Sequence, residues 1–271
     1  MSELAEKLVD AETGEQEIPK GKKLSWKEKI SYGFGDCGNG FMFDLGQAYL
    51  TKYWIDVCMI PAGAVAGIFA FTKIFDAFMD PLAGSLIDSR KNIGVRGKFR
   101  PVMMISSVLL ALLTIVTFTM PEISMGWKIV FAYGAYMAWG LVYSFTNIPY
   151  GSLASVMTRD VNERSQLATT RQAGSVTAQL LTGIGFVPIL MMFSNPHQGF
   201  FVASIIMAII GVAGFYICYR NTREHVKINR NTTAEKKAGF KDYLRVVFTN
   251  KPLLCLILMT LFTISAMNTN N

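Results

Sequence analysis

The stretch Ile68–Gly84 of this 271-residue chain, IFAFTKIFDAFMDPLAG, places three charged residues inside a strongly apolar run. Lys73, Asp76 and Asp80 are spaced at i, i+3 and i+7, so an α-helix carries all three on one face. In a bilayer each such charge costs about 2.5–3.5 kcal/mol by insertion scales, so we expect these charges to have a use. A structural Lys–Asp pair explains one aspartate. Two carboxylates four residues apart repel each other unless a cation or proton lies between them, and we therefore interpret Asp76 and Asp80 as a coupling-ion site.

The rest of the sequence has the composition of a membrane protein. Hydrophobic residues make up 51% of the chain and charged residues 17%, against roughly 25% charged residues in soluble domains. A bilayer is crossed by about 20 apolar residues in a helix. Six runs of suitable length occur near residues 31–54, 62–87, 101–120, 127–157, 174–193 and 199–219. A seventh begins at Pro252, so we predict an all-α membrane protein with six complete spans and the start of another.

Lysine and arginine gather in alternate connections between these runs. They lie in the N-terminal tail, in 90–100, at 159 and 164, and in 220–251, whereas 55–61 and 194–199 contain neither. This alternation follows the positive-inside rule and predicts a multi-pass protein of the cell membrane with a cytoplasmic N-terminus. The net charge of +7 comes from these loops, which argues against a nucleic-acid partner. The first 28 residues have no apolar core and therefore are not a signal peptide.

Four segments follow from this pattern. We expect a cytoplasmic polar tail over 1–28, a six-span bundle over 29–219, a basic cytoplasmic linker over 220–251 and the truncated start of a second bundle over 252–271. Many transporters repeat a membrane unit on the far side of such a linker. The layout therefore predicts half of a transporter, whose missing partner is the C-terminal half.

Glycine is concentrated in the first span. Gly33, Gly35, Gly38 and Gly40 fall within eight residues. Small residues allow membrane helices to approach closely, and this density also predicts a locally broken or bent helix that lines a cavity.

A polar motif follows the second span. Gly84, Asp88 and Arg90 precede the basic segment 97–101, GKFRP. The order glycine, acid, basic residues resembles the loop signature of the major facilitator superfamily. Asp88 can cap a helix end and pair with Arg90 or another basic residue, so we expect a gating cluster here; an ordinary solvated loop is the alternative.

Further motifs narrow the resemblance. They are YGFGDCGN at 32–39, FDAFMDP at 75–81, WGLVYSFTNIPYGSL at 139–153 and ERSQL at 163–167, followed by Arg171. Their order and spacing resemble the glycoside–pentoside–hexuronide:cation symporters, the group that includes the melibiose permease. The resemblance implies a major facilitator type N-terminal bundle and sugar:cation symport by alternating access, with no cofactor other than the coupling cation.

The resemblance also implies a cation site in the second span. The family's acids match Asp76 and Asp80, and its hydroxyl residue in span four matches Ser144. The family's Na⁺ site has an asparagine where this chain has Met79, and a thioether is a poor ligand for a hard cation. Na⁺ and H⁺ therefore both remain open as coupling ions. Lys73 is expected to relieve the repulsion between the empty aspartates.

The family's sugar site draws on spans one, four and five. The matching positions of this chain are Asn39, Gly40, Tyr143, Asn147, Gly151 and Arg171. In the melibiose permease acids stand at the Gly40 and Asn147 positions and a tryptophan at the Gly151 position. The differences predict another sugar, which the sequence does not name.

The residue types in this set are suited to a sugar. Asn147 can hydrogen-bond a hydroxyl group, and Tyr143 or Tyr150 can stack on a ring face. Arg171 can donate a fork of N–H groups and would suit a uronate carboxylate. Asp36 lies one helical turn before Gly40 and could replace the missing acid.

Two other functions fit parts of the sequence. Gly33 to Asp36 match the G-x-G-D pattern of intramembrane aspartyl proteases, but no Tyr-Asp helix precedes them and no Pro-Ala-Leu motif follows. A non-transporting half-protein that binds a sugar or a partner is the second alternative. We expect a transporter rather than an enzyme.

Overall fold

The computed structural model describes residues 23–89, 96–225 and a few later positions, which are 249, 250, 252, 254, 255 and 259. The chain divides into two compact units, Met1–Lys227 and Ile228–Asn271. The first contains the predicted bundle and is the one described below. Arg90, most of the predicted linker and nearly all of the predicted seventh span lie outside the described residues.

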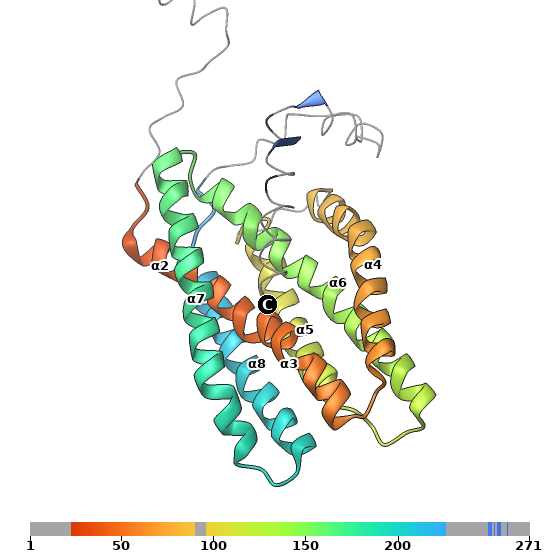
Figure 1. The fold of residues 1–271 in the computed structure, drawn as a ribbon. Helices are drawn as coiled ribbons and strands as arrows, with labels where there is room; N and C mark the ends of the chain where they lie inside the picture. Colours follow the sequence, from red (N-terminus) through yellow and green to blue (C-terminus); the bar gives the residue numbers. More distant parts are fainter. Residues whose placement is uncertain are drawn as a thin grey trace, which may run out of the picture. The chain divides into compact units, whose positions relative to one another are not determined.

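The first unit is a bundle of long helices (Figure 1). The first apolar run forms α2 (Trp26–Asn39), η1 (Gly40–Asp44), α3 (Leu45–Lys52) and η2 (Tyr53–Val57) in direct succession. The other runs form α4 (Ala62–Asp88), α5 (Arg100–Thr117), α6 (Met125–Met157), α7 (Val161–Met191) and α8 (Pro196–Asn221). Each of these last five is long and apolar enough to cross a membrane. The prediction of an all-α membrane protein is confirmed.

Local capping signals set several helix starts. The Ser25 hydroxyl accepts a hydrogen bond from the Glu28 backbone N–H, and the Glu28 carboxylate accepts one from the Ser25 N–H, which is a capping box for α2. Asp160 and Asn195 cap α7 and α8 in the same way, through side-chain oxygens that accept backbone N–H groups.

The first span is irregular, although Gly33, Gly35 and Gly38 lie within the regular helix α2. The α-helical pattern widens to π-helical turns in η1 and η2. Such bulges occur frequently at functional sites because they rotate the following side chains relative to a regular helix. The glycines also allow close packing, since a Cβ atom on Gly33 would lie 2.4 Å from the Thr170 carbonyl oxygen of α7.

The fifth span begins earlier than its apolar run. Hydropathy placed its start near residue 174, whereas α7 begins at Val161. The first half of α7 is polar, but its charged side chains have partners: Glu163 forms an ion pair with Lys29 at 2.9 Å, and Arg171 pairs with Asp36. Arg164 donates to the Thr158 carbonyl. Side chains of other helices thus stabilise charges that made this segment too polar to be recognised as part of a span from its hydropathy.

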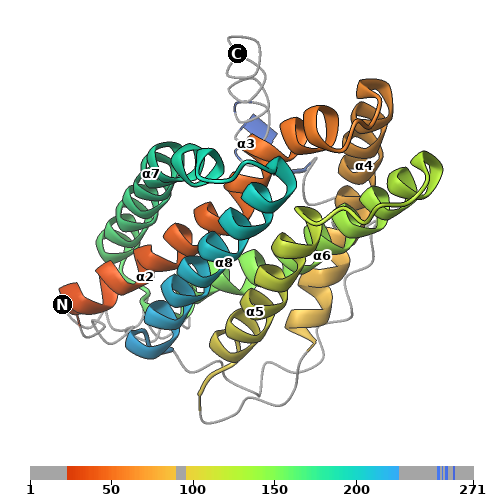
Figure 2. The ribbon, with the colours of Figure 1, turned by 90° about the horizontal axis from the view of Figure 1, so that it is seen from below.

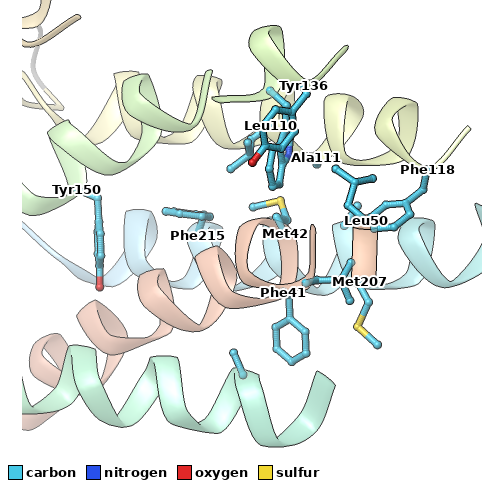
Figure 3. Packing of buried hydrophobic residues seen from close by; sticks show 14 of the residues in the cluster. Phe41, Met42, Leu50, Leu110, Ala111, Phe118, Tyr136, Tyr150, Met207 and Phe215 are labelled. Carbon is cyan, nitrogen blue, oxygen red and sulfur yellow. The ribbon is translucent and has the colours of Figure 1, made fainter. Parts of the chain in front are cut away.

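The helices are arranged so that α2 lies between α7 and α8, α5 lies between α8 and α6, and α4 packs on α6 (Figure 2). Met42 of the first span is fully buried and faces Leu110 of α5, and Phe41 points to the opposite side (Figure 3). Trp139 of α6 is also fully buried and donates its indole N–H to the Thr114 hydroxyl of α5 at 3.0 Å. The first span therefore packs against α5, α7 and α8, while Lys27, Lys52 and Asp56 are among its exposed polar residues.

Candidate functional site

A charged pair joins the first and fifth spans. Arg171 Nε donates to Asp36 Oδ2 at 2.9 Å, and Nη2 donates to Oδ1 at 3.2 Å. The two planar groups thus meet in the bidentate geometry that gives Arg–carboxylate pairs their strength. The Asp36 side chain is 15% exposed and the Arg171 side chain is 32% exposed, so the pair is only partly buried. Asp36 is consequently held by Arg171, rather than being a free acid near Gly40.

Two tyrosines fix this pair in place. The Tyr150 hydroxyl of α6 donates to the Tyr32 carbonyl at 2.7 Å and accepts the Asp36 backbone N–H at 3.1 Å. The Tyr32 hydroxyl donates in return to the Tyr150 carbonyl. The Arg171 guanidinium carbon lies 4.7 Å from the Tyr150 ring centroid, a cation–π contact. Tyr150 is fully buried, and in this conformation it supports Arg171 and leaves no ring face open to a sugar.

A glycine lies beside the third nitrogen of Arg171. Asp36 occupies Nε and Nη2, and the Tyr32 side chain is a further hydrogen-bond partner of Arg171. Nη1 lies 3.9 Å from the point where a side chain on Gly151 would begin. The glycine therefore leaves space beside the guanidinium.

The other expected sugar-binding residues lie further along the same helices. Asn39 donates from its amide nitrogen to Asn147 Oδ1 at 3.4 Å, while its own Oδ1 is buried without a partner. Tyr143 stacks on Phe43, with ring centroids 3.5 Å apart. The structure thus brings Asn39 next to Asn147.

Asp44 is a polar residue of this region that the sequence analysis missed. It ends η1, and its Oδ2 lies 3.5 Å from the position that a Cβ on Gly40 would take. The Gln179 side chain of α7 hydrogen-bonds to it. The signal was present in the sequence, because Asp36, Gly40 and Asp44 are spaced four residues apart in an apolar run. Asp44 thus places a carboxylate in front of Gly40.

The two aspartates of the second span both face α6. A Cβ on Gly140 would lie 3.1 Å from Asp76 Oδ1, which is buried and has no hydrogen-bond partner. One turn further on, the Ser144 hydroxyl donates to Asp80 Oδ1. The predicted cation-site residues Asp76, Asp80 and Ser144 therefore share one interface between α4 and α6, with an orphaned acceptor oxygen in it.

Lys73 lies near the predicted cation site. It is exposed and forms no ion pair with either aspartate, although its charge acts on Asp76. In residues 23–89 and 96–225, no group of three or more His, Cys, Asp or Glu side chains could hold a metal ion. Asp76, Asp80 and Ser144 therefore offer two carboxylates and one hydroxyl to a cation at this interface.

The expected gating cluster lies only partly within the described residues. Lys98 Nζ lies 3.5 Å from Asp88 Oδ1 and donates to the Asp88 carbonyl at 3.0 Å. Arg90 is outside the described residues. The sequence analysis missed Glu224, which follows α8: its carboxylate accepts the backbone N–H groups of residues 98, 99 and 100 at 2.8–3.1 Å. This carboxylate caps α5 and ties it to the end of α8.

The chain is similar in sequence to known transport proteins. The family model described as "MFS/sugar transport protein" matches residues 31–271. The chain is 49% identical over 98% of its length to "Uncharacterized symporter YjmB" of Bacillus subtilis, covering 56% of that protein. It is 37% identical over 92% of its length to a "Putative sulfoquinovose importer" of Escherichia coli, covering 53%. It is also 34% identical over 90% of its length to a "Glucuronide carrier protein homolog" of Escherichia coli, covering 54%. The chain thus spans about half the length of these curated relatives.

Proposed function

Since the chain belongs to the MFS/sugar transport protein family, we propose that it forms one half of a symporter that couples an anionic sugar to a cation. It is a multi-pass membrane protein and not an enzyme, because its relatives are transporters. The intramembrane protease hypothesis is therefore wrong. In the structure, Asp36 of its G-x-G-D pattern pairs with an arginine and not with a second aspartate.

The observation that carries this proposal is the partly exposed Arg171, whose Nη1 lies beside the space that Gly151 leaves. A guanidinium recognises a carboxylate or sulfonate through paired N–H groups. The names of two relatives specify a glucuronide and a sulfoquinovose, both of which carry an acidic group. In the proposed complex the anionic group of the sugar binds Nη1, while Asp36 holds the other edge of the guanidinium in position.

The neutral part of the sugar lies further along the first span in this proposal. Sugar hydroxyls are donors, and the Asp44 carboxylate is an acceptor. Asn39 and Asn147 can exchange their long 3.4 Å contact for hydrogen bonds with the substrate, which would also satisfy the orphaned Asn39 Oδ1. This set of polar groups is consistent with one acidic group and several hydroxyls.

The coupling ion binds between α4 and α6 in this proposal. The buried Asp76 Oδ1 lacks a partner, and a proton or Na⁺ at this oxygen would supply one. A bound cation also removes the repulsion between Asp76 and Asp80. Coupling is then the mutual stabilisation of cation and sugar, and the bundle rocks against the missing half with its N-terminus in the cytoplasm.

Radiolabelled glucuronate uptake by cells that express the complete protein tests the substrate. Arg171→Lys keeps the charge but loses the paired N–H groups of the guanidinium. The half-saturating glucuronate concentration should therefore rise about tenfold to hundredfold, which corresponds to the loss of one charged hydrogen bond. Arg159→Lys is the matched control, because Arg159 is exposed and has no partner among the described residues. Uptake of glucose in preference to glucuronate, with equal kinetics in both variants, would overturn the anionic-sugar proposal.

Cation coupling needs a separate test. Asp76→Asn should abolish accumulation driven by a Na⁺ or pH gradient while leaving energy-independent exchange of the sugar. Asp56→Asn, in the exposed end of the first span, is the control. Undiminished gradient-driven accumulation by Asp76→Asn would disprove the role of this aspartate.

A further inference from the structure

A basic hollow lies between the start of α2 and the end of α8. It encloses about 380 Å³, within the size range of small-molecule sites. It is lined by Lys23, Ser25, Lys27, Glu28, Arg220, Asn221, Arg223 and His225. Four of these eight side chains are always cationic at neutral pH and only one is a carboxylate, so the hollow favours an anion.

The single carboxylate is already engaged. Glu28 Oε2 accepts the Ser25 N–H in the capping box, and Oε1 lies 2.8 Å from His225 Nε2. The four Lys and Arg side chains form no ion pair with any described residue. The positive charge of the hollow is therefore not neutralised by the part of the chain that the structure describes.

An apolar groove begins next to this hollow. It encloses about 210 Å³ between α2 and α7 and is lined by Ile30, Gly33, Phe34, Cys37, Thr170, Ala173, Gly174 and Thr177. Ile30 is 53% exposed and Phe34 40% exposed, so the groove opens to the outside of the bundle. The close approach of Gly33 and Gly174 forms its floor.

One face of α2 connects the two cavities. Lys27 lines the hollow, and Ile30, Phe34 and Cys37 line the groove. These four residues follow the i, i+3, i+7, i+10 spacing that places side chains in one row along a helix. Lys27 of the hollow thus lies one helical turn from Ile30 of the groove, on the same side of α2.

We propose that this combined site binds one anionic phospholipid of the leaflet at the lysine-rich end of the bundle. The phosphate lies among the four cations, and one acyl chain follows the groove between α2 and α7. Basic pockets between membrane helices attract anionic headgroups, and each nearby cation adds about fivefold to lipid affinity. Because Arg171 belongs to α7, the lipid would contact the same helix pair that forms the proposed sugar site, although its binding does not depend on transport.

Native mass spectrometry of the purified complete protein, titrated with phosphatidylglycerol or phosphatidylcholine, tests this site. Wild type should retain phosphatidylglycerol preferentially. Lys27→Gln combined with Arg220→Gln should weaken that retention about 10- to 30-fold, with phosphatidylcholine retention unchanged as evidence of intact folding. Arg159→Gln at the same end of the bundle should have no effect, because Arg159 does not line the hollow.

A second pair of variants tests whether an acyl chain occupies the groove. Ala173→Phe fills the groove and should weaken phosphatidylglycerol retention several-fold, whereas Ala168→Phe, exposed on the same helix but outside the groove, should not. Competition by glycerol phosphate or inorganic phosphate at the lipid's own concentration, with no effect of Ala173→Phe, would identify a soluble anion and overturn the lipid assignment. Equal losses in Arg159→Gln and the double variant would show unspecific surface charge and overturn the site itself.

Discussion

Replacing Gly174 by alanine should separate the two helices that hold the Asp36–Arg171 pair. A Cβ atom at Gly174 would lie 2.1 Å from the Gly33 carbonyl oxygen and 3.3 Å from the Cys37 backbone nitrogen. Both neighbours are backbone atoms of α2, so no side-chain rotation relieves the overlap. The helices must move apart by roughly 1 Å to reach ordinary contact distance, and a packed interface resists such a change.

The size of the effect follows from two opposing terms. Overpacking costs about 1–3 kcal/mol, whereas Gly→Ala in a helix gains up to about 1 kcal/mol of propensity. Gly183→Ala, on the same α7, isolates the first term, because nothing lies within 4 Å of its added Cβ. Relative to Gly183→Ala, Gly174→Ala should lower the melting temperature by roughly 2–12 °C, the shift that 1–3 kcal/mol produces at this chain length.

Thermal unfolding of the purified variants in detergent measures this difference, and uptake assays measure its functional consequence. Arg171 lies one turn before Gly174, and Asp36 one turn after Gly33, so the shift should also lengthen the 2.9 Å and 3.2 Å hydrogen bonds and weaken sugar binding. The reasoning fails if Gly174→Ala melts at the temperature of Gly183→Ala, because the close approach of α2 and α7 would then not exist.

Three further changes test other contacts. Ser144→Ala removes the donor to Asp80 and should raise the half-saturating cation concentration about tenfold or more in transport assays; an unchanged value would remove Ser144 from the cation site. Glu224→Gln weakens the cap at the Phe99 end of α5 and should lower the stability of the bundle by about 1–2 kcal/mol. Thermal unfolding measures this change, and a stability equal to that of the wild type would contradict the role of the cap. Asp44→Asn should raise the half-saturating sugar concentration about tenfold without altering cation dependence, whereas altered cation dependence alone would assign Asp44 to coupling.

The apolar runs were sufficient to predict the membrane spans, because crossing a bilayer requires a length and polarity that a single segment reveals. The spacing of Asp76 and Asp80 likewise predicted a shared helix face, and Ser144 does meet Asp80 from α6. The predicted start of the fifth span, near residue 174, was too late because hydropathy treats each charge as if it had no partner. Lys29 and Asp36 pair with Glu163 and Arg171 in the polar half of that helix, and no window along the chain contains both partners of either pair.

The sequence by itself determined the helical class, the approximate spans and the polar residues available for a site, since these depend on local composition and helical period. Only the tertiary structure decided which polar groups pair, namely Asp36 with Arg171 and Glu224 with the start of α5. It also decided that the Asp44 carboxylate lies beside Gly40. Such pairings depend on how closely helices approach and on the rotation introduced by the π-helical turn at η1. These are properties of packed interfaces between distant segments, and a residue's type and its neighbours in the chain do not specify them.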